Sequence, residues 1–294
     1  MTDATADTPT VTAEDEETRR PLWRSILTHA VLIAASFAML YPILWMISAS
    51  FRPEEEIFTS TSLIPSQITL EAYPQGWFGL RVSFGQFFMN SLVISILSVV
   101  GNVFACSLAA FAFARLRFPG RNFFFALMLG TLMLPYHVTL IPQYVLFLNL
   151  DWVNTILPLV VPKFMAVDAF FIFLMVQFFR GIPRELDEAA RMDGCSPFRI
   201  YWRVIMPLSV PVLATAAIFT FLWTWDDFFG PLIYLNDMQQ YTVQLGLRSF
   251  IDSSGTSNWS GLFAMSLLSL VPVFLFFLFF QRLLIDGIAT TGLK

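Results

Sequence analysis

IPRELDEAARMDGCSPFRIYWRVIMP, residues 182–207, is the longest charged interruption between the hydrophobic segments of this chain. It predicts two short helices with a hinge between them. Pro183 suits a first helical position, where its missing N–H is not needed. Gly194 suits the end of the first helix because glycine tolerates the left-handed backbone conformation. Ser196 and Pro197 then suit the N-cap and the first residue of a second helix.

The first of these helices begins with negative charge. Glu185, Asp187 and Glu188 fall in its opening turns, where the helix dipole favours acids. One face is formed by residues at helical spacing, namely Leu186, Ala189, Ala190 and Asp193. A solvated connector between two membrane helices would carry the same features, so the stretch alone leaves both interpretations open.

The composition is not that of an ordinary soluble domain. Of the 294 residues, 56% are hydrophobic, only 13% are charged and 33 are Phe, whereas soluble domains carry about 25% charged residues. The mean hydropathy is +0.67, and apolar windows of about 20 residues, enough to cross a bilayer, recur along the chain. Cys106 and Cys195 form no disulfide framework and no Cys/His cluster for zinc, so both are expected to act as small packing residues.

Six membrane spans are predicted, so the expected fold class is an all-α polytopic membrane protein. Their approximate ranges are 26–49, 86–114, 122–148, 154–179, 207–234 and 261–281. Proline interrupts the first span at Pro42 and the third at Pro135 and Pro142, which membrane helices tolerate. The second span carries small or polar residues of the kind that mark helix–helix packing, namely Asn90, Ser91, Ser95, Gly101 and Asn102.

Three regions follow from these spans. Residues 1–24 are rich in acids and threonine and are predicted to be a disordered tail. Residues 25–285 are predicted to form the six-span domain, with the charged loop at 180–206 between spans four and five. Residues 286–294 form a short C-terminal tail. Because the N-terminal tail lacks the basic start of a cleavable signal, the first span is expected to remain as an anchor.

The basic residues predict the orientation. With six spans, one side of the membrane holds all but four of the 17 Lys and Arg residues, and those four are Arg52, Arg81, Lys163 and Arg248. Lys and Arg concentrate on the cytoplasmic side of membrane proteins. Both termini and the charged loop are therefore predicted to be cytoplasmic.

Several catalytic chemistries are missing from the sequence. A phosphate-binding P-loop needs Gly-Lys followed by Ser or Thr, but neither lysine, Lys163 or Lys294, follows a glycine. His29 and His137 form no HExxH motif, and no GxSxG elbow is present. The sequence therefore predicts neither ATP hydrolysis by a P-loop nor an intramembrane enzyme. A net charge of −4 says little about nucleic acid, and no nucleic-acid partner is expected.

The charged stretch also resembles a known motif. Glu188-Ala189-Ala190, three residues, Gly194, nine residues and then residues 204–207 (VIMP) are similar to the EAA motif of ABC importer permeases, EAA-x3-G-x9-I-x-L-P. Valine at 204 in place of Ile and methionine at 206 in place of Leu are conservative departures.

The resemblance extends over nearly the whole chain, from about residue 41 to residue 294. The segments that resemble the carbohydrate-importer branch are SFRPEEEIF (50–58), AFARLRFPGR (112–121), MLPYHVTLIPQY (133–144), NTILPLVVP (154–162), WTWDDFFGPLIYL (223–235) and DGIATTGLK (286–294). Within that branch, the chain looks like the smaller, six-span permease of maltose-type transporters.

The resemblance implies a transport subunit and not an enzyme. It implies a binding-protein-dependent ABC importer in the plasma (inner) membrane of a prokaryote, in which this permease forms half of the translocation pathway. The expected substrate is a di- or oligosaccharide, or a related sugar or polyol. The expected partners are a second homologous permease in a heterodimer, a dimer of ATP-binding cassette ATPase subunits, an extracytoplasmic solute-binding protein and membrane lipid. ATP and Mg would be bound by the ATPase subunits, with no cofactor bound directly by this chain.

The resemblance also assigns residues to ATPase coupling. In the family the EAA helix docks in a cleft of the ATPase, which places Glu188, Ala189, Ala190, Arg191, Asp193, Gly194 and Pro207 at the coupling site. Small alanines let a helix seat closely against another protein, Glu188 offers a charge, and Gly194 permits the bend. In maltose-type permeases the C-terminal end reaches the ATPase subunits, which points to Gly292 and Lys294. A frayed terminus is the alternative for those two residues.

The substrate path is less well defined by the sequence. Asp168 lies near the middle of a predicted span, where an ionisable residue is a candidate functional residue. It would either accept hydrogen bonds from sugar hydroxyls or pair with a polar group of a neighbouring helix. Trp225, Asp226 and Asp227 combine an aromatic ring with carboxylates, which suits sugars, although aromatic residues also gather at membrane interfaces.

A secondary transporter driven by an ion gradient is the alternative function. Such proteins often contain inverted repeats and ionisable residues in several spans. No clear repeat is present in this sequence, and a docking loop would have no use there.

Overall fold

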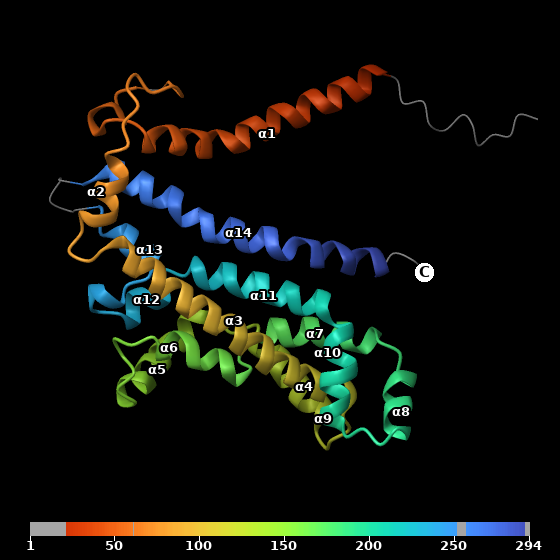
Figure 1. Ribbon diagram of the computed structural model, residues 1–294. Helices are drawn as coiled ribbons and strands as arrows, with labels where there is room; N and C mark the ends of the chain where they lie inside the picture. The colour runs from red at the N-terminus through yellow and green to blue at the C-terminus, as the bar shows by residue number, and fades with distance from the viewer. Residues whose placement is uncertain (1–21, 61, 252–256, 292–294) are drawn as a thin grey trace, which may run out of the picture.

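A computed structural model describes residues 22–60, 62–251 and 257–291 as a bundle of helices (Figure 1). The described residues contain no β-strand. Four of their helical segments are long and apolar enough to cross a membrane, namely Trp23–Ser50, Phe84–Arg115, Leu157–Gly181 and Trp259–Leu283. The predicted all-α membrane fold is therefore confirmed.

The count of six spans is not confirmed. A fifth span among the described residues is obtained if Pro197–Leu208 and Val210–Trp225, bent by 79° relative to each other, are taken together. The predicted third span is divided into α4 (Arg121–Thr131) and α5 (Tyr136–Asn149), with Pro135 as the N-cap of α5. A proline with extended backbone cannot continue the preceding helix, so the span ends there and restarts.

The longest buried helix, α3 (Phe84–Arg115), lies at the centre of the bundle. It packs against α11 (Val210–Trp225), α7 (Ala169–Gly181) and the 3-10 helix η2 (Val161–Met165). On the other side of α11 lies α14 (Trp259–Thr291), which also contacts α1 (Leu22–Ser50). The remaining short elements outside the charged loop are η1 (Glu54–Glu56), α2 (Ala72–Phe78), α6 (Leu157–Val160), α12 (Phe229–Tyr234), η4 (Met238–Gln240) and α13 (Val243–Arg248).

The small and polar residues of α3 lie in helix contacts, as predicted. Ser91, Ser95, Gly101 and Asn102 are buried. A side chain at Gly101 would bring its Cβ within 2.5 Å of the ring of Phe164, so η2 approaches the backbone of α3 closely. Asn102 Nδ2 donates a hydrogen bond of 2.7 Å to Oγ1 of a threonine in α11. The helices can therefore come together at short range, as small residues allow in membranes.

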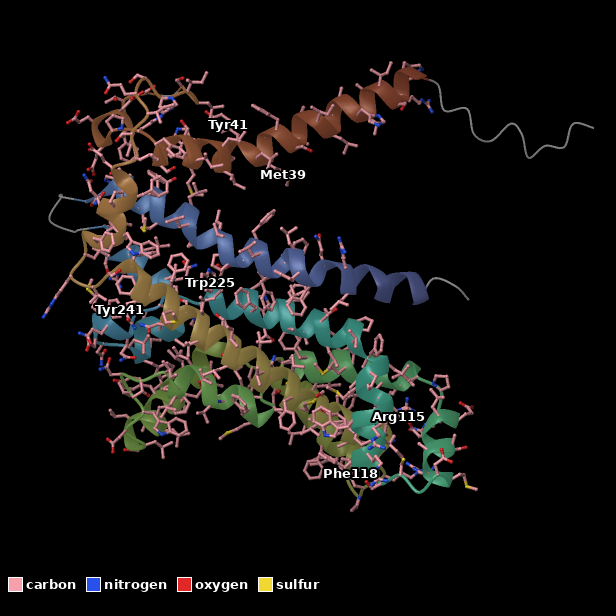
Figure 2. The ribbon with its side chains drawn as sticks, viewed as in Figure 1. Met39, Tyr41, Arg115, Phe118, Trp225 and Tyr241 are labelled. Atoms are coloured by element: carbon pink, nitrogen blue, oxygen red, sulfur yellow. The ribbon has the colours of Figure 1, made fainter. Side chains whose placement is uncertain are left out.

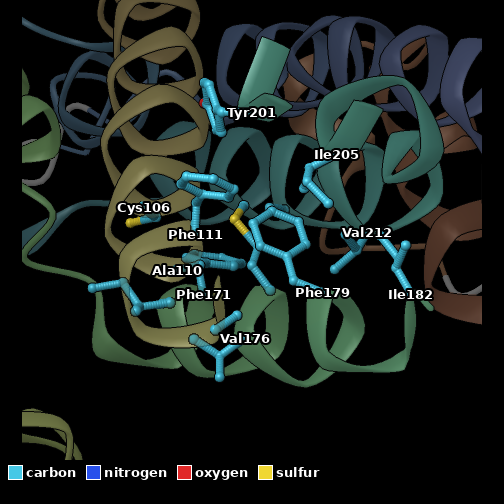
Figure 3. Close-up of a cluster of buried hydrophobic side chains, with 14 of the residues drawn as sticks. Cys106, Ala110, Phe111, Phe171, Val176, Phe179, Ile182, Tyr201, Ile205 and Val212 are labelled. Carbon is cyan, nitrogen blue, oxygen red and sulfur yellow. The ribbon is translucent and has the colours of Figure 1, made fainter. Parts of the chain in front are cut away.

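An apolar core joins α3 and α7 to the segment that follows the charged loop (Figure 3). Phe111 from α3 and Phe179 from α7 meet Tyr201 and Ile205 there. Cys106 is fully buried in this cluster and Cys195 packs at its edge, which is consistent with the packing role expected for both cysteines.

The loop after α1 folds back on itself through a buried arginine. Arg52 is 1% exposed and donates hydrogen bonds to Ser48 Oγ at 3.0 and 3.2 Å and to the carbonyl of Ser60 at 3.1 Å. Glu56 accepts hydrogen bonds from the hydroxyl and the backbone N–H of Ser66, and these bonds lower the pKa of its carboxyl. The loop is therefore ordered by polar contacts of its own.

The first and last long helices extend beyond the spans predicted for them. α1 begins at Leu22 and α14 continues to Thr291, although the part of α14 that could cross a membrane, Trp259–Leu283, agrees with the predicted span at about 261–281. The start of α1, the end of α14 and the loop helix α8 (Glu185–Met192) lie at the same end of the molecule (Figure 1). Met39 and Tyr41 of α1 are exposed apolar side chains (Figure 2), part of a surface that no described residue covers.

Candidate functional site

The charged stretch folds into the predicted pair of short helices. The first is α8, and Gly194 follows it in the left-handed conformation, with φ +77°. Its N–H bonds the carbonyl of Arg191 at 2.9 Å. The second begins at Ser196, whose Oγ accepts the N–H of Arg199 at 3.4 Å. Only the start differs from the prediction: α8 begins at Glu185, so Pro183 precedes the helix instead of opening it.

One face of α8 is open to solvent. Leu186, Glu188, Ala189 and Asp193 are exposed, and Met192 is 89% exposed. Arg191 is exposed as well, whereas Ala190 packs against the apolar core. A short helix with exposed leucine and methionine side chains, projecting from the end of the bundle, is a surface suited to contact with another protein.

The opposite face of α8 is held by a buried ion pair that the sequence did not reveal. Arg115 Nη1, at the last position of α3, lies 3.2 Å from Asp187 Oδ2, and their side chains are 2% and 7% exposed. The second Nη of Arg115 donates to the carbonyls of Phe179 and Ile182, at 2.6 and 2.7 Å. Arg115 therefore joins the end of α3, the end of α7 and the start of α8 (Figure 2).

The chain then turns sharply before it enters the bundle. α9 (Pro197–Ile200), a π-helical turn η3 (Tyr201–Ile205) and α10 (Met206–Leu208) form one segment that meets α11 at 79°. Pro207 lies in α10, two residues before the bend at Ser209. Tyr201 Oη and Ser107 Oγ, 2.7 Å apart, join this segment to α3. The predicted coupling residues therefore lie on two separate parts of the loop: those from Glu188 to Gly194 on α8 and the turn after it, and Pro207 on α10, with the buried residues Tyr201 and Ile205 between them.

The structure does not test the two C-terminal residues assigned to ATPase contact. Gly292 and Lys294 lie outside the described residues.

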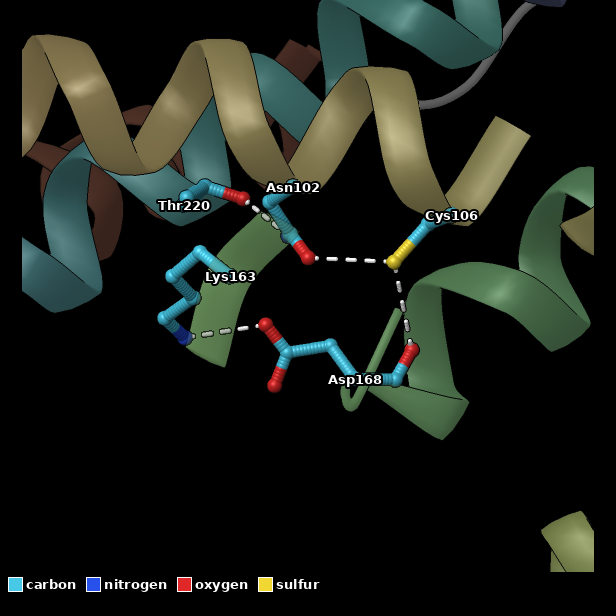
Figure 4. A network of polar contacts seen from close by, with 5 residues as sticks. All are labelled: Asn102, Cys106, Lys163, Asp168 and Thr220. Carbon is cyan, nitrogen blue, oxygen red and sulfur yellow. Dashed lines mark hydrogen bonds and ion pairs between the residues drawn. The ribbon is translucent and has the colours of Figure 1, made fainter. Parts of the chain in front are cut away.

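A second candidate site is a cavity of about 620 Å³ between α4, α5, η2 and α12. Asp168 and Asp227 both line it, as does Lys163, which the sequence reasoning did not single out. Lys163 Nζ lies 2.9 Å from Asp168 Oδ2, and each side chain is 28% exposed (Figure 4). The structure therefore supports the pairing alternative for Asp168, although the partner comes from its own span and not from a neighbouring helix.

A break in the helical backbone places this ion pair. η2 ends at Met165, Ala166 adopts a left-handed conformation with φ +52°, and α7 begins at Ala169 with Asp168 as its N-cap. The Asp168 carboxylate makes no capping bond and reaches Lys163 instead. Behind it, Cys106 Sγ donates to the Asp168 carbonyl at 3.8 Å (Figure 4). A lysine in an apolar stretch, five residues before an aspartate, was the available signal for this pair.

The other two residues predicted for the substrate path lie elsewhere. Trp225 is 1% exposed, packs in the core against Phe221 and donates its indole N–H to the Ser269 carbonyl at 3.1 Å. It therefore has no free face for a sugar, and the expectation of stacking at Trp225 is corrected. Asp226 is exposed and accepts a hydrogen bond of 3.2 Å from Gln244, away from the residues that line the cavity.

No group of three or more His, Cys, Asp or Glu side chains within the described part of the chain is arranged to hold a metal ion. The two candidate sites are thus an exposed helix at one end of the bundle and a cavity lined by charged and polar side chains inside it.

Comparison with known proteins gives consistent matches. The family described as "Binding-protein-dependent transport system inner membrane component" matches residues 101–289. The arabinooligosaccharides transport system permease protein AraQ of Halalkalibacterium halodurans is 36% identical over 277 residues, covering 93% of this chain and 98% of AraQ. The sn-glycerol-3-phosphate transport system permease protein UgpE of Brucella abortus is 31% identical over 280 residues, covering 93% of this chain and 98% of UgpE.

A solved structure shares the fold. It is a chain of a bacterial ABC transporter involved in the import of the acidic polysaccharide alginate, with a TM-score of 0.79 and 22% sequence identity. The match covers 94% of this chain and 99% of that one.

Proposed function

The chain belongs to the family of binding-protein-dependent transport system inner membrane components, and we propose that it serves an importer for a di- or oligosaccharide or a related sugar or polyol. It is a permease subunit of an ABC importer and not an enzyme. The oligosaccharide class is supported by AraQ, whose name gives arabinooligosaccharides as the molecules transported. UgpE, whose name gives sn-glycerol-3-phosphate, supports only the wider class of polyols and their derivatives.

The observation that carries the proposal is the arrangement of α8. Its exposed face presents Glu188, Ala189 and Met192 to a partner, while its opposite face is tied to α3 through Asp187 and Arg115. A helix that is open on one side and anchored on the other can pass a partner's movement to the bundle as a rigid-body shift. We propose that the partner is the ATPase subunit and that α8 docks in its cleft.

The remaining parts of the proposal concern the assembly. A second, homologous permease completes the translocation pathway, and exposed apolar surface such as that of α1 is available for it or for lipid. A dimer of ATPase subunits binds ATP and Mg on the cytoplasmic side, which is the side that the basic residues of the sequence predict for α8 and both termini. A solute-binding protein delivers the sugar from the other side. The N-terminal tail 1–24, the transmembrane domain 25–285 and the C-terminal tail with its Gly292 and Lys294 contacts complete this proposed organisation.

The test is ATP-driven uptake by the complete importer in proteoliposomes without an ion gradient. Glu188→Lys reverses an exposed charge and leaves the anchor intact, so we expect uptake to fall about tenfold or more, the factor that ~1.4 kcal/mol of lost docking energy produces. Gly194→Val forces a β-branched residue into the left-handed conformation, at a cost of roughly 1–2 kcal/mol or more, and should uncouple ATP hydrolysis from uptake.

The matched control is Gly194→Asn, since asparagine tolerates this conformation far better than valine and no atom lies within 4 Å of a Cβ at this position. Normal uptake by both Glu188→Lys and Gly194→Val would refute the docking proposal. Uptake that needs an ion gradient but no ATP would favour a secondary transporter instead.

A further inference from the structure

We propose that Lys163, Asp168 and Asp227 form the substrate contact of this subunit, in a cavity that accepts a neutral polyhydroxylated chain and excludes anionic ones. This inference rests on the proposed transport function and adds to it the position of the contact and the charge class of the substrate.

The first support is the interruption of the span between η2 and α7. The backbone leaves the helix at Ala166 and resumes it at Ala169. Within a membrane, non-helical backbone is tolerated only where protein buries it or where it lines a water-filled cavity. Here the interrupted stretch borders the cavity, since Val167 and Asp168 both line it. Discontinuous helices of this kind form substrate sites in other transporters.

The second support is the chemistry of the lining. Lys163 and Asp168 are paired, but each side chain remains 28% exposed and both line the cavity, so neither is fully buried in the protein. An ammonium group has three N–H donors and a carboxylate has several acceptor sites. The contact between Lys163 and Asp168 uses one donor and one acceptor site, so the others are left for a ligand. Thr139 and Gln143 add neutral polar groups on the facing helix α5. A polyol, whose hydroxyls both donate and accept, matches this mixture.

The third support is the charge balance. Two carboxylates, Asp168 and Asp227, and one ammonium, Lys163, line the cavity, and the other lining residues are uncharged. Asp227 Oδ1 accepts the N–H of Gly230 at 3.1 Å. With both carboxylates ionised, the lining has a formal charge of one net negative. Because like charges repel each other, an anionic sugar would be disfavoured at this lining. A neutral sugar would not be repelled. The cavity volume of about 620 Å³ is within the usual range for small-molecule sites.

The experiment measures the electrostatic character of the cavity without needing the natural substrate. A reporter cysteine is placed at Gln143, in a chain with Cys106→Ser and Cys195→Ser, within the assembled importer. Its reaction rates with a cationic and an anionic methanethiosulfonate reagent are compared with those of Gln67→Cys, an exposed control position outside the cavity. We expect the cation-to-anion rate ratio at residue 143 to exceed that at residue 67 severalfold.

Charge variants make the test specific. Asp227→Asn neutralises the site and should lower the ratio to that of the control, whereas Lys163→Gln leaves two carboxylates and should raise it further. A ratio that matches the control in the unmodified cavity, or one that Asp227→Asn leaves unchanged, would overturn the proposal. Failure of the Gln143→Cys thiol to react with either reagent would also overturn it, because the cavity would then be closed to polar solutes.

A protection assay tests the ligand class. Arabinotriose and maltotriose serve as neutral probes and trigalacturonate as the anionic probe, each added before the thiol reagent. The neutral probes should slow the reaction at residue 143 severalfold more than trigalacturonate does. Equal protection by trigalacturonate, or protection by none of the three, would count against a neutral polyol site. ATP-dependent uptake and its loss in Glu188→Lys are measured on the same preparation, so the transport function is tested independently of the ligand class.

Discussion

Arg115 is the residue on which the position of α8 depends most. Arg115 is the last residue of α3; its guanidinium pairs with the carboxylate of Asp187 and donates hydrogen bonds to two carbonyls at the end of α7. Both members of the ion pair are almost completely buried. An ion pair of this kind is costly to break from one side, because the remaining charge is left buried without its partner.

We therefore predict that Arg115→Ala and Asp187→Ala each lower the free energy of unfolding by about 3–5 kcal/mol. The double variant Arg115→Met/Asp187→Leu, which removes both charges and keeps the volume, should lose much less than the two single losses combined. Denaturant unfolding of the purified complex measures all three.

Arg117→Ala is the matched control, since this arginine lies two residues further on and is exposed; its effect should stay within about 0.5 kcal/mol. The importance of the pair would be refuted if Arg115→Ala unfolded no more easily than Arg117→Ala.

At the residue scale, features that depend on neighbouring residues were predictable from the sequence, whereas contacts between distant residues were not. The glycine stop at Gly194 and the cap at Ser196 depend only on neighbouring residues, and both were predictable. The Arg115–Asp187 pair joins segments far apart in the chain, so no spacing rule could identify it. Lys163 and Asp168 are close in sequence, but they meet only because the helix breaks between them.

At the scale of the element, α3 shows how a membrane helix can be fitted to its neighbours by small residues. Gly101 lies where the ring of Phe164 in η2 approaches the backbone of α3. The same helix carries Ser91, which accepts the N–H of Val243 at 2.8 Å. Replacing these small groups by larger ones would force η2 and α13 away from α3.

Gly101→Ala is predicted to destabilise the complex by about 1–3 kcal/mol, because the added methyl group would overlap the Phe164 ring. Thermal unfolding of the purified complex measures the loss. Combining it with Phe164→Leu should recover part of the stability, since the flat ring would no longer occupy that space.

Gly130→Ala provides the control for the glycine effect itself. It lies in α4, and no atom is within 4 Å of a Cβ there, so the change should be neutral or stabilise by up to about 1 kcal/mol. If Gly101→Ala behaved like Gly130→Ala, close packing of η2 on α3 would be excluded.

Hydropathy predicted where the apolar segments lie but not how each is divided. The spans at α1, α3 and α14 agree with the prediction because no residue in these segments interrupts the helix. The third predicted span separates at Pro135, and the fourth is interrupted at Ala166. Such breaks depend on tertiary contacts and on backbone conformations that a hydropathy window does not register.

At the scale of the whole molecule, the elements that connect the long helices gather at two opposite ends of the bundle. The loop helix α8 lies at the same end as the start of α1 and the end of α14, whereas α2 and α13 lie at the other (Figure 1). From the charge distribution of the sequence we propose that the first end is cytoplasmic.

Thiol labelling tests this orientation. We predict that a membrane-impermeant thiol reagent modifies Cys195, which follows α8, only when the ATPase-facing side is exposed. In the variant Gln67→Cys/Cys195→Ser the same reagent should act only from the opposite side. Cys106 is fully buried and should stay unmodified in both. Labelling of positions 67 and 195 from the same side would contradict the orientation.

The uninterrupted length of α3 has a consequence for the timing of transport. Its 32 residues span about 48 Å at 1.5 Å per residue. At one end Arg115 holds α8, and near the other Asn90 bonds the carbonyls of Gln239 and Tyr241 at 2.8 and 3.0 Å. A stiff rod fixed at both ends moves as one piece, so a shift of the docked α8 would displace residues 239–241, at the opposite end of the bundle, in the same step.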